Sequence, residues 1–166
     1  MAEYRNVTIV PDEDTEGYWQ AAREHRLVMK KCSECGLMRW YPGPSCPFCT
    51  SLEWEWQEVS GKGTIYSYQI VTQAIQTGFR DYVPYPLVLV ELDEQRNTPE
   101  PDISLRIATN LVDENFAPVP ESEVAIGKRV QVVFQDVSAD LALPQFRLSD
   151  EPPEGPVWQL SQSSGG

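Results

Sequence analysis

The chain has 166 residues, 41% of them hydrophobic, and a formal net charge of -12 at pH 7. This length predicts one compact core with a small appendage. The acidic balance argues against nucleic acid and anionic membranes as partners, because both are bound largely through Lys and Arg. The sequence has no run of about 18 apolar residues and begins with a polar, acidic segment instead of a signal peptide, which predicts a soluble, cytoplasmic protein.

The first predicted element is a short helix over residues 16–26. Asp14 and Thr15 precede it and can cap its first turn. Tyr18 and Trp19 place aromatic bulk on one side of this helix, which is too short to be stable without docking. Because aromatic residues suit both cores and interfaces, the helix packs either on its own ribbon or on another protein chain.

The four cysteines of the chain form two C-x2-C pairs with ten residues between them: Cys32, Cys35, Cys46 and Cys49. Two such turns can aim four thiolates at one ion, which predicts a structural zinc ribbon with a strand over residues 37–41 that includes Trp40. Four protein ligands leave no open position, so the site serves structure and not catalysis. A disulfide pair is the less favoured alternative, and the same ligands could also hold rubredoxin-like iron.

The rest of the chain alternates β-branched and aromatic residues with polar ones, as strands do. One strand at 52–59 ends the ribbon region. Five more are predicted after it, at 64–75, 86–93, 103–107, 129–137 and 145–149. The insert at 110–126 is acidic and contains prolines, so it has room for at most one turn of helix. Five short strands with an insert after the third predict a small Greek-key barrel of the OB type.

The expected fold is therefore mainly β, with an N-terminal helix, a four-cysteine zinc ribbon, a five-stranded OB-fold barrel and a flexible C-terminal tail. The expected divisions are an N-terminal segment with the docking helix (1–26), the zinc ribbon (27–60), the OB-fold (61–149) and the extended tail (150–166). The tail contains three prolines and ends in Ser-Ser-Gly-Gly, which is typical of an extended or disordered segment. Trp158 in this tail is either a binding anchor or a residue that packs back on the barrel.

The loop at 76–85 is long for a hairpin and is the best candidate for contact with a ligand or partner. It contains Phe79, Arg80, Tyr82 and Tyr85, which could cover an apolar group and offer one guanidinium to a phosphate or carboxylate. In the alternative interpretation, these aromatic side chains simply cap the mouth of the barrel.

The sequence indicates no catalytic residue. It contains no G-x-S-x-G, H-E-x-x-H or glycine-rich phosphate motif. His25, the only histidine, lies at the end of the predicted helix, where a favourable interaction with the helix C-terminus explains it more simply than a role as a base. Arg96 and Arg106 are expected to be solvated or paired with the many carboxylates of the chain.

Beyond the cysteine knuckles, several short motifs follow in a specific order: Trp56, Ser60–Gly63, Tyr66–Ser67, Pro86–Asp93 and Ile126–Val130. This order resembles the zinc-ribbon plus OB-fold family of acyl-CoA-associated proteins, domain of unknown function 35 (DUF35). The resemblance covers about residues 14–149. Two segments depart from the family pattern, at 41–44 and 93–96, and they bear on the subfamily more than on the fold.

The resemblance implies a non-catalytic partner of a thiolase-superfamily (lipid-transfer-protein-like) enzyme in a hetero-oligomer. Residues 79–86 with 103–106 look most like the version paired with aldolases that cleave steroid side chains from CoA thioesters. The ribbon and helix would dock on the partner, and the barrel would border its acyl-CoA entrance. The docking residues expected on this basis are Tyr18, Trp19, Trp40 and Trp158.

Two other classes of function remain open at this point. OB barrels and zinc ribbons also occur in single-stranded nucleic-acid-binding proteins, although the charge argues against that function. Catalysis by the chain itself would need a nucleophile with a base, or an open metal position, and neither is evident.

Overall fold

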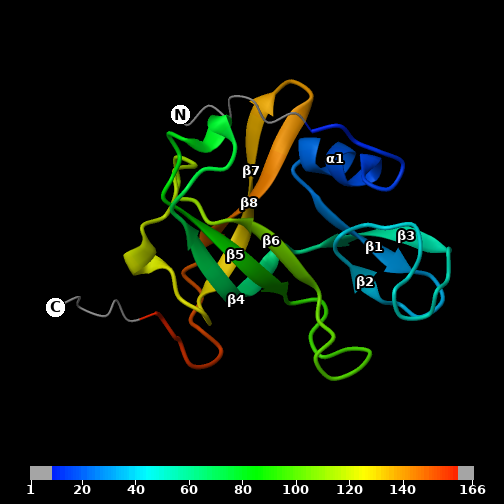
Figure 1. Ribbon diagram of the computed structural model, residues 1–166. Coiled ribbons are helices and arrows are strands. Elements are labelled where there is room, and N and C mark those ends of the chain that lie inside the picture. Colours follow the sequence, from blue (N-terminus) through cyan, green and yellow to red (C-terminus); the bar gives the residue numbers. More distant parts are fainter. Residues whose placement is uncertain (1–8, 161–166) are drawn as a thin grey trace.

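The computed structural model describes residues 9–160. Figure 1 shows a β-barrel on one side, a small ribbon sheet on the other, and one helix above the ribbon. The helix and the ribbon strands are α1 (Glu16–Arg23), β1 (Leu27–Cys32), β2 (Met38–Arg39) and β3 (Trp54–Val59). The barrel strands are β4 (Lys62–Val71), β5 (Tyr85–Leu92), β6 (Arg106–Asn110), β7 (Arg129–Ser138) and β8 (Leu141–Leu148). Two 3-10 turns, η1 (Thr77–Phe79) and η2 (Glu121–Glu123), interrupt the loops.

The barrel has the strand order β6-β5-β4-β7-β8, with antiparallel neighbours throughout. A parallel bridge between Leu111 and Phe146 joins the end of β6 to β8, and the Val112 N–H donates to the Phe146 carbonyl at 2.8 Å. This contact joins the two end strands of the sheet at one point, as in a partly open OB barrel. The five-stranded OB prediction is therefore confirmed, as is the single helical turn in the 110–126 insert.

The ribbon is a separate three-stranded sheet with the order β2-β1-β3. The strand β1 was not expected from the sequence, because Lys30 and Lys31 obscure its apolar character. Its first half, Leu27 to Met29, is buried in the same apolar cluster as the barrel core. The ribbon and the barrel thus share part of one core.

Two contacts fix the ribbon against its neighbours. The buried Gln95 side chain accepts a hydrogen bond from the Met38 N–H at 2.8 Å and donates to the Met38 carbonyl at 2.9 Å, so the loop after β5 pairs with β2. Above the sheet, α1 approaches β3 so closely that a Cβ at Gly17 would lie 2.2 Å from Trp56 Nε1. The absence of a side chain at Gly17 therefore sets the depth at which α1 packs.

Several predicted boundaries were wrong. The first barrel strand ends at Val71 and not at residue 75. The helix ends at Arg23 and not at residue 26, because His25 adopts a left-handed conformation with φ 57°. The third barrel strand starts at Arg106, while Ile103 packs against the cysteine cluster. The fifth barrel strand begins at Leu141, four residues earlier than expected, even though Pro144 lies within it.

The loop before α1 is organised differently from the predicted cap. Thr15 occupies the N-cap position, but its hydroxyl donates to the Asp12 carboxylate at 2.6 Å instead of accepting from the helix. Asp12 also accepts from the Thr15 N–H at 2.9 Å. Asp14 turns away from the helix and accepts from the Lys30 ammonium at 2.6 Å.

Residues 150–160 are extended, as predicted, and are tied to the barrel. Ile126 and Trp158 exchange two backbone hydrogen bonds, of 2.8 and 2.9 Å. Glu151 accepts from Arg129 at 3.0 Å and from Lys62 at 2.5 Å. The remaining tail residues, 161–166, and the N-terminal residues 1–8 lie outside the described range.

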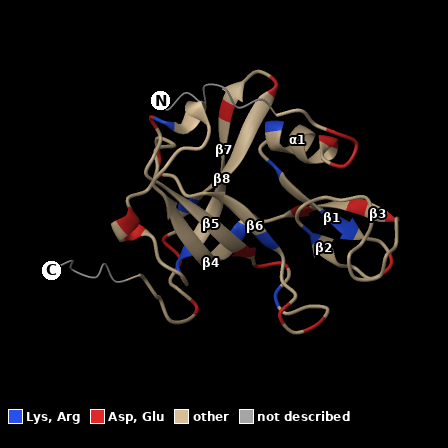
Figure 2. Ribbon diagram, in the orientation of Figure 1, with Lys and Arg blue, Asp and Glu red and all other residues tan. Residues whose placement is uncertain are grey.

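Acidic side chains are spread over the loops, and η2 and the loop before α1 are red in Figure 2. Basic side chains colour β1 and short parts of the barrel strands. Within residues 9–160, we find no helix long and apolar enough to cross a membrane.

Candidate functional site

The two cysteine pairs lie on matching turns. In each turn, the first cysteine donates its N–H to the carbonyl five residues later and accepts from the N–H four residues later. The four bonds are Cys32 N to Leu37 O at 2.9 Å, Gly36 N to Cys32 O at 2.9 Å, Cys46 N to Ser51 O at 2.8 Å and Thr50 N to Cys46 O at 2.9 Å. Gly36 and Thr50 both have a positive φ, of 77° and 64°. The equal spacing of the pairs therefore produces two equal metal-binding knuckles.

All four sulfur atoms lie within 4.8 Å of one another. Cys32 Sγ is 3.5 Å from Cys49 Sγ, and Cys35 Sγ is 3.6 Å from Cys46 Sγ. A tetrahedral zinc ion with Zn–S bonds of about 2.3 Å needs sulfur atoms about 3.8 Å apart, so the cluster fits this ion.

In each knuckle the pKa of the first thiol is lowered (Cys32, Cys46) and that of the second is raised (Cys35, Cys49), where a backbone hydrogen bond lowers the pKa but burial and neighbouring thiols raise it further. A hydrogen bond from the Cys35 backbone N–H lowers the pKa of Cys32 to about 6. With four thiolates around one ion, the coordination shell is complete, and the site is a structural zinc centre.

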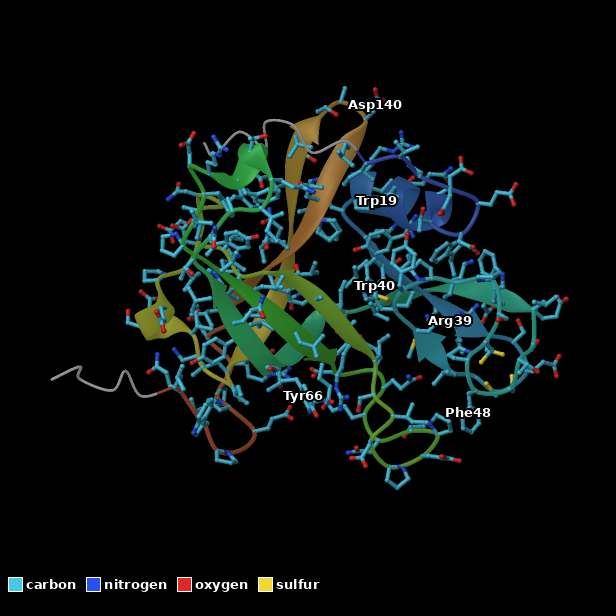
Figure 3. The ribbon with its side chains drawn as sticks, in the orientation of Figure 1. Trp19, Arg39, Trp40, Phe48, Tyr66 and Asp140 are labelled. Atoms are coloured by element: carbon cyan, nitrogen blue, oxygen red, sulfur yellow. The ribbon has the colours of Figure 1, made fainter. Side chains whose placement is uncertain are left out.

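An aromatic groove runs along the boundary between α1, the ribbon and the barrel. Its volume is about 300 Å³, and its walls come from α1, the segment after β2, the 76–85 loop, β6 and β8. Figure 3 labels Trp19 on α1 and Trp40 next to the ribbon sheet, and both residues line this groove. The groove brings three of the predicted docking residues, Tyr18, Trp19 and Trp40, together with Phe79 of the predicted contact loop.

The aromatic residues of the groove differ in exposure. Tyr18 is 4% exposed, and its ring lies 4.6 Å from the Trp40 ring and 5.1 Å from the Trp19 ring. The buried Tyr18 ring therefore packs against both tryptophan rings. Trp19 and Trp40 themselves are half-buried. Tyr41, which the sequence analysis did not single out, is 63% exposed and stacks edge-on against Trp40 at 5.5 Å. Its position next to Trp40 was the signal that could have identified it.

The contact loop holds a cluster of three half-buried aromatic rings. The Tyr82 and Tyr85 rings lie 5.3 Å apart, and Phe79 is 5.9 Å from Tyr85 and 6.2 Å from Tyr82. The rings stiffen the loop, and Phe79 also lines the groove. Arg80 lies on the exposed side of the same loop.

The other singled-out residues lie elsewhere. Trp158 is 54% exposed and sits in the tail on the barrel, outside the groove. His25 hydrogen-bonds to Asp136 at 2.8 Å and stacks on Phe134 at 5.3 Å, so its side chain joins the segment after α1 to β7 instead of interacting with the end of the helix. Its ring is exposed and part of a surface contact.

The predicted pairing of arginines with carboxylates is confirmed. Arg106 contacts Glu91 at 3.1 Å and lies over the Tyr66 ring at 3.8 Å. Arg96 donates to Glu154 at 2.5 Å and also pairs with Asp93. These guanidinium groups are neutralised within the chain.

Fold and site together define an OB-fold protein with an N-terminal four-cysteine zinc ribbon. The family models described as "ChsH2, rubredoxin-like zinc ribbon domain" and "ChsH2, C-terminal OB-fold domain" match residues 19–55 and 56–135. The solved structure "Ltp2-ChsH2(DUF35) aldolase" is 31% identical and superposes with a TM-score of 0.68 over 85% of this chain and 98% of that chain. The chain belongs to the DUF35 family.

Curated relatives include archaeal and bacterial proteins. A "DUF35 domain-containing scaffold protein" of Methanocaldococcus jannaschii is 31% identical over 124 residues, which are 74% of this chain and 77% of the relative. A "Probable enoyl-CoA hydratase alpha subunit" of Thermomonospora curvata is 34% identical over 136 residues, or 82% of this chain. The chain spans only 38% of the length of that relative. A DUF35 structure from Sulfolobus solfataricus, 14% identical with a TM-score of 0.50, shares the fold.

Proposed function

We propose that this chain is a non-catalytic accessory subunit of a thiolase-superfamily enzyme that acts on acyl-CoA thioesters in the cytoplasm. The observation that carries this proposal is its likeness to the chain of the Ltp2-ChsH2 aldolase, which extends over 98% of that chain. On the same basis, the partner is most specifically a retro-aldolase that cleaves a steroid-type side chain.

The aromatic groove is the surface we assign to the partner. It is apolar, it lies where α1 and the ribbon meet the barrel, and Tyr41 and Trp40 project from its rim. Large amphipathic rings with part of their surface exposed are typical of interface anchors. Docking there would bury Tyr41 and the outer faces of Trp19 and Trp40.

The contact loop is the part we assign to the border of the acyl-CoA channel. Phe79 lies in the groove and Arg80 on the exposed side, so a partner on the groove would have this loop at its edge. The paired state of Arg96, Arg106 and Arg129 argues that the CoA phosphates are held mainly by the partner, with Arg80 as the contribution of this chain.

Co-expression with a lipid-transfer-protein-like thiolase tests the proposal. We expect a stable complex that cleaves or thiolyses a CoA thioester, and no activity from this chain alone. Tyr41→Ser and Phe79→Ser should each weaken the complex at least tenfold, as at interface hot spots. Phe48→Ser is the matched control, because Phe48 is an exposed aromatic residue (42%) at the outer end of the ribbon, away from the groove in Figure 3. Failure to bind, or equal weakening by all three substitutions, would contradict the assignment.

A further inference from the structure

Two cations are buried next to each other in the ribbon. Lys30 is 0% and Arg39 is 6% exposed, and they are direct cross-strand partners on β1 and β2. Both donate to one acceptor, the Gly43 carbonyl, at 3.3 Å from Lys30 Nζ and 3.1 Å from Arg39 Nη2. Buried like charges at neighbouring positions are costly unless something balances them.

The charges within the described chain balance this pair only in part. Asp14, half-buried, accepts from Lys30 at 2.6 Å and neutralises one cation. In contrast, Arg39 Nε and Nη1 are buried and have no hydrogen-bond partner among the described residues. An arginine guanidinium stays charged in proteins, so one buried positive charge needs a further negative neighbour.

The unbalanced charge lies on the same face of the ribbon sheet as the zinc ligand Cys32. Side chains two residues apart on a strand share a face, so Lys30 and Cys32 point to the same side of β1. The Lys30 ammonium lies 3.9 Å above the ring of Trp54, the residue directly opposite Cys32 in the β1–β3 pairing. The ammonium therefore lies over the ring of a residue that is paired with the metal ligand Cys32.

The acceptor shared by the two cations belongs to the segment that joins the knuckles. Gly43 stands between Arg39 and Cys46, three residues before the second knuckle begins. Holding its carbonyl from two sides fixes the path of the chain into Cys46. Figure 3 shows Arg39 on the ribbon sheet, between Trp40 and the cysteine sulfurs.

We propose that Lys30 and Arg39 are positioning residues of the zinc centre. A divalent ion held by four thiolates has two net negative charges, and the cation pair, which keeps one net positive charge beside Asp14, opposes them across a low-dielectric interior. The same pair holds the Gly43 carbonyl and so sets the approach of the second knuckle. Metal binding and the burial of Lys30 and Arg39 thus stabilise each other.

Zinc affinity measured by competition with a chelator tests this proposal on the full chain. Loss of an outer-shell partner typically weakens metal binding about 10–100-fold, and we expect this range for Lys30→Gln and for Arg39→Gln. Lys31→Gln is the matched control. Lys31 is one residue further on β1, faces the other side and contacts Glu55 at 3.8 Å, so the affinity should stay within about twofold. Equal zinc affinity for all three folded variants and the wild type would overturn the proposal.

Two further variants separate charge from packing, and they serve if a Gln variant does not fold. Arg39→Lys keeps the positive charge and should stay within about threefold of wild-type zinc affinity. Asp14→Asn removes the anchoring carboxylate but keeps both cations, and should also retain zinc. If Arg39→Lys or Asp14→Asn binds zinc tenfold or more weakly, the pair acts through packing alone and the proposed charge balance is refuted. The absorption bands of the cobalt-substituted protein report whether the tetrahedral geometry persists.

Discussion

The knuckle end of the ribbon (residues 32–53) and the barrel use opposite means to hold their strands and turns in place. The knuckle end buries few apolar side chains of its own, chiefly Leu37 among the cysteines, with Ile103 added from a barrel loop. The barrel encloses fully buried residues from its strands, such as Ile65, Val90 and Phe146. Burial of apolar surface stabilises the barrel, whereas the knuckle end needs its metal. The comparison shows that the apolar core can stabilise most of the chain, while the knuckle end depends on the bonds between its cysteines and the metal.

Removing the metal ligands should have the largest effect, and this effect should be confined to the knuckle end. Apparent zinc-binding free energies in small metal domains are about 10–16 kcal/mol. We therefore expect Cys46→Ser, or chelation, to abolish hydrogen-exchange protection at the knuckle end while the amides of β5 stay protected. Equal loss of protection in β5 would show that the barrel also depends on the metal.

Truncating the barrel core should produce the reverse pattern. Phe146 is 0% exposed, so Phe146→Ala should lower the free energy of unfolding by about 3–5 kcal/mol in a urea titration. The zinc affinity of the folded variant should remain that of the wild type. Phe48→Ala, an exposed site on the ribbon, should change stability by less than about 0.5 kcal/mol. A large loss of zinc affinity in Phe146→Ala would mean that the two regions are coupled more tightly than their cores indicate.

A methyl group between the helix and the ribbon tests the contact that joins α1 to β3. Gly17→Ala places a Cβ 2.2 Å from Trp56 Nε1, so either α1 or the Trp56 ring must move. Overpacking of this kind costs about 1–3 kcal/mol. Thermal unfolding should detect this loss, and the groove formed with α1 should bind the partner less tightly. Gly155→Ala, where a Cβ meets nothing within 4 Å, is the control, and equal stability of both variants would contradict the close packing.

The smallest effect concerns acid stability of the barrel. A hydrogen bond from Arg129 lowers the pKa of Asp93 below its ordinary value of 3.8. A carboxylate with a lowered pKa stabilises the fold above its unfolded-state pKa, and this contribution disappears as the pH falls through the lowered value. Asp93→Asn should therefore be less stable than wild type at pH 7, and the difference should shrink below pH 3.8. Unfolding midpoints measured in urea across this range check the sign.

The metal site and the barrel could be predicted because their signals are local. The spacing of four cysteines specifies two turns directly, and the apolar run in β5 and the alternation in β7 need only neighbouring residues. Element ends were harder to predict. Pro144 argues against a strand by its missing N–H, but it pairs with Phe134 inside the sheet.

The groove and the joints could not be predicted, because they depend on residues that are far apart in the sequence. Gln95 looks like an ordinary polar loop residue, and only the fold places its amide against Met38. Lys30 suggests a solvated face, whereas tertiary packing buries it completely. The sequence analysis placed Phe79 and Trp40 in separate candidate surfaces, and the structure joins them in one.

The position of the tail has a practical consequence for handling this protein. Leu160 donates its N–H to the Tyr68 hydroxyl at 2.9 Å, and Trp158 pairs with Ile126 on the barrel. In Figure 1, this end of the described chain lies on the side opposite the ribbon. A sensor chip or bead attached after residue 160 would hold the molecule by its barrel and present α1, Trp19 and Tyr41 to the solution.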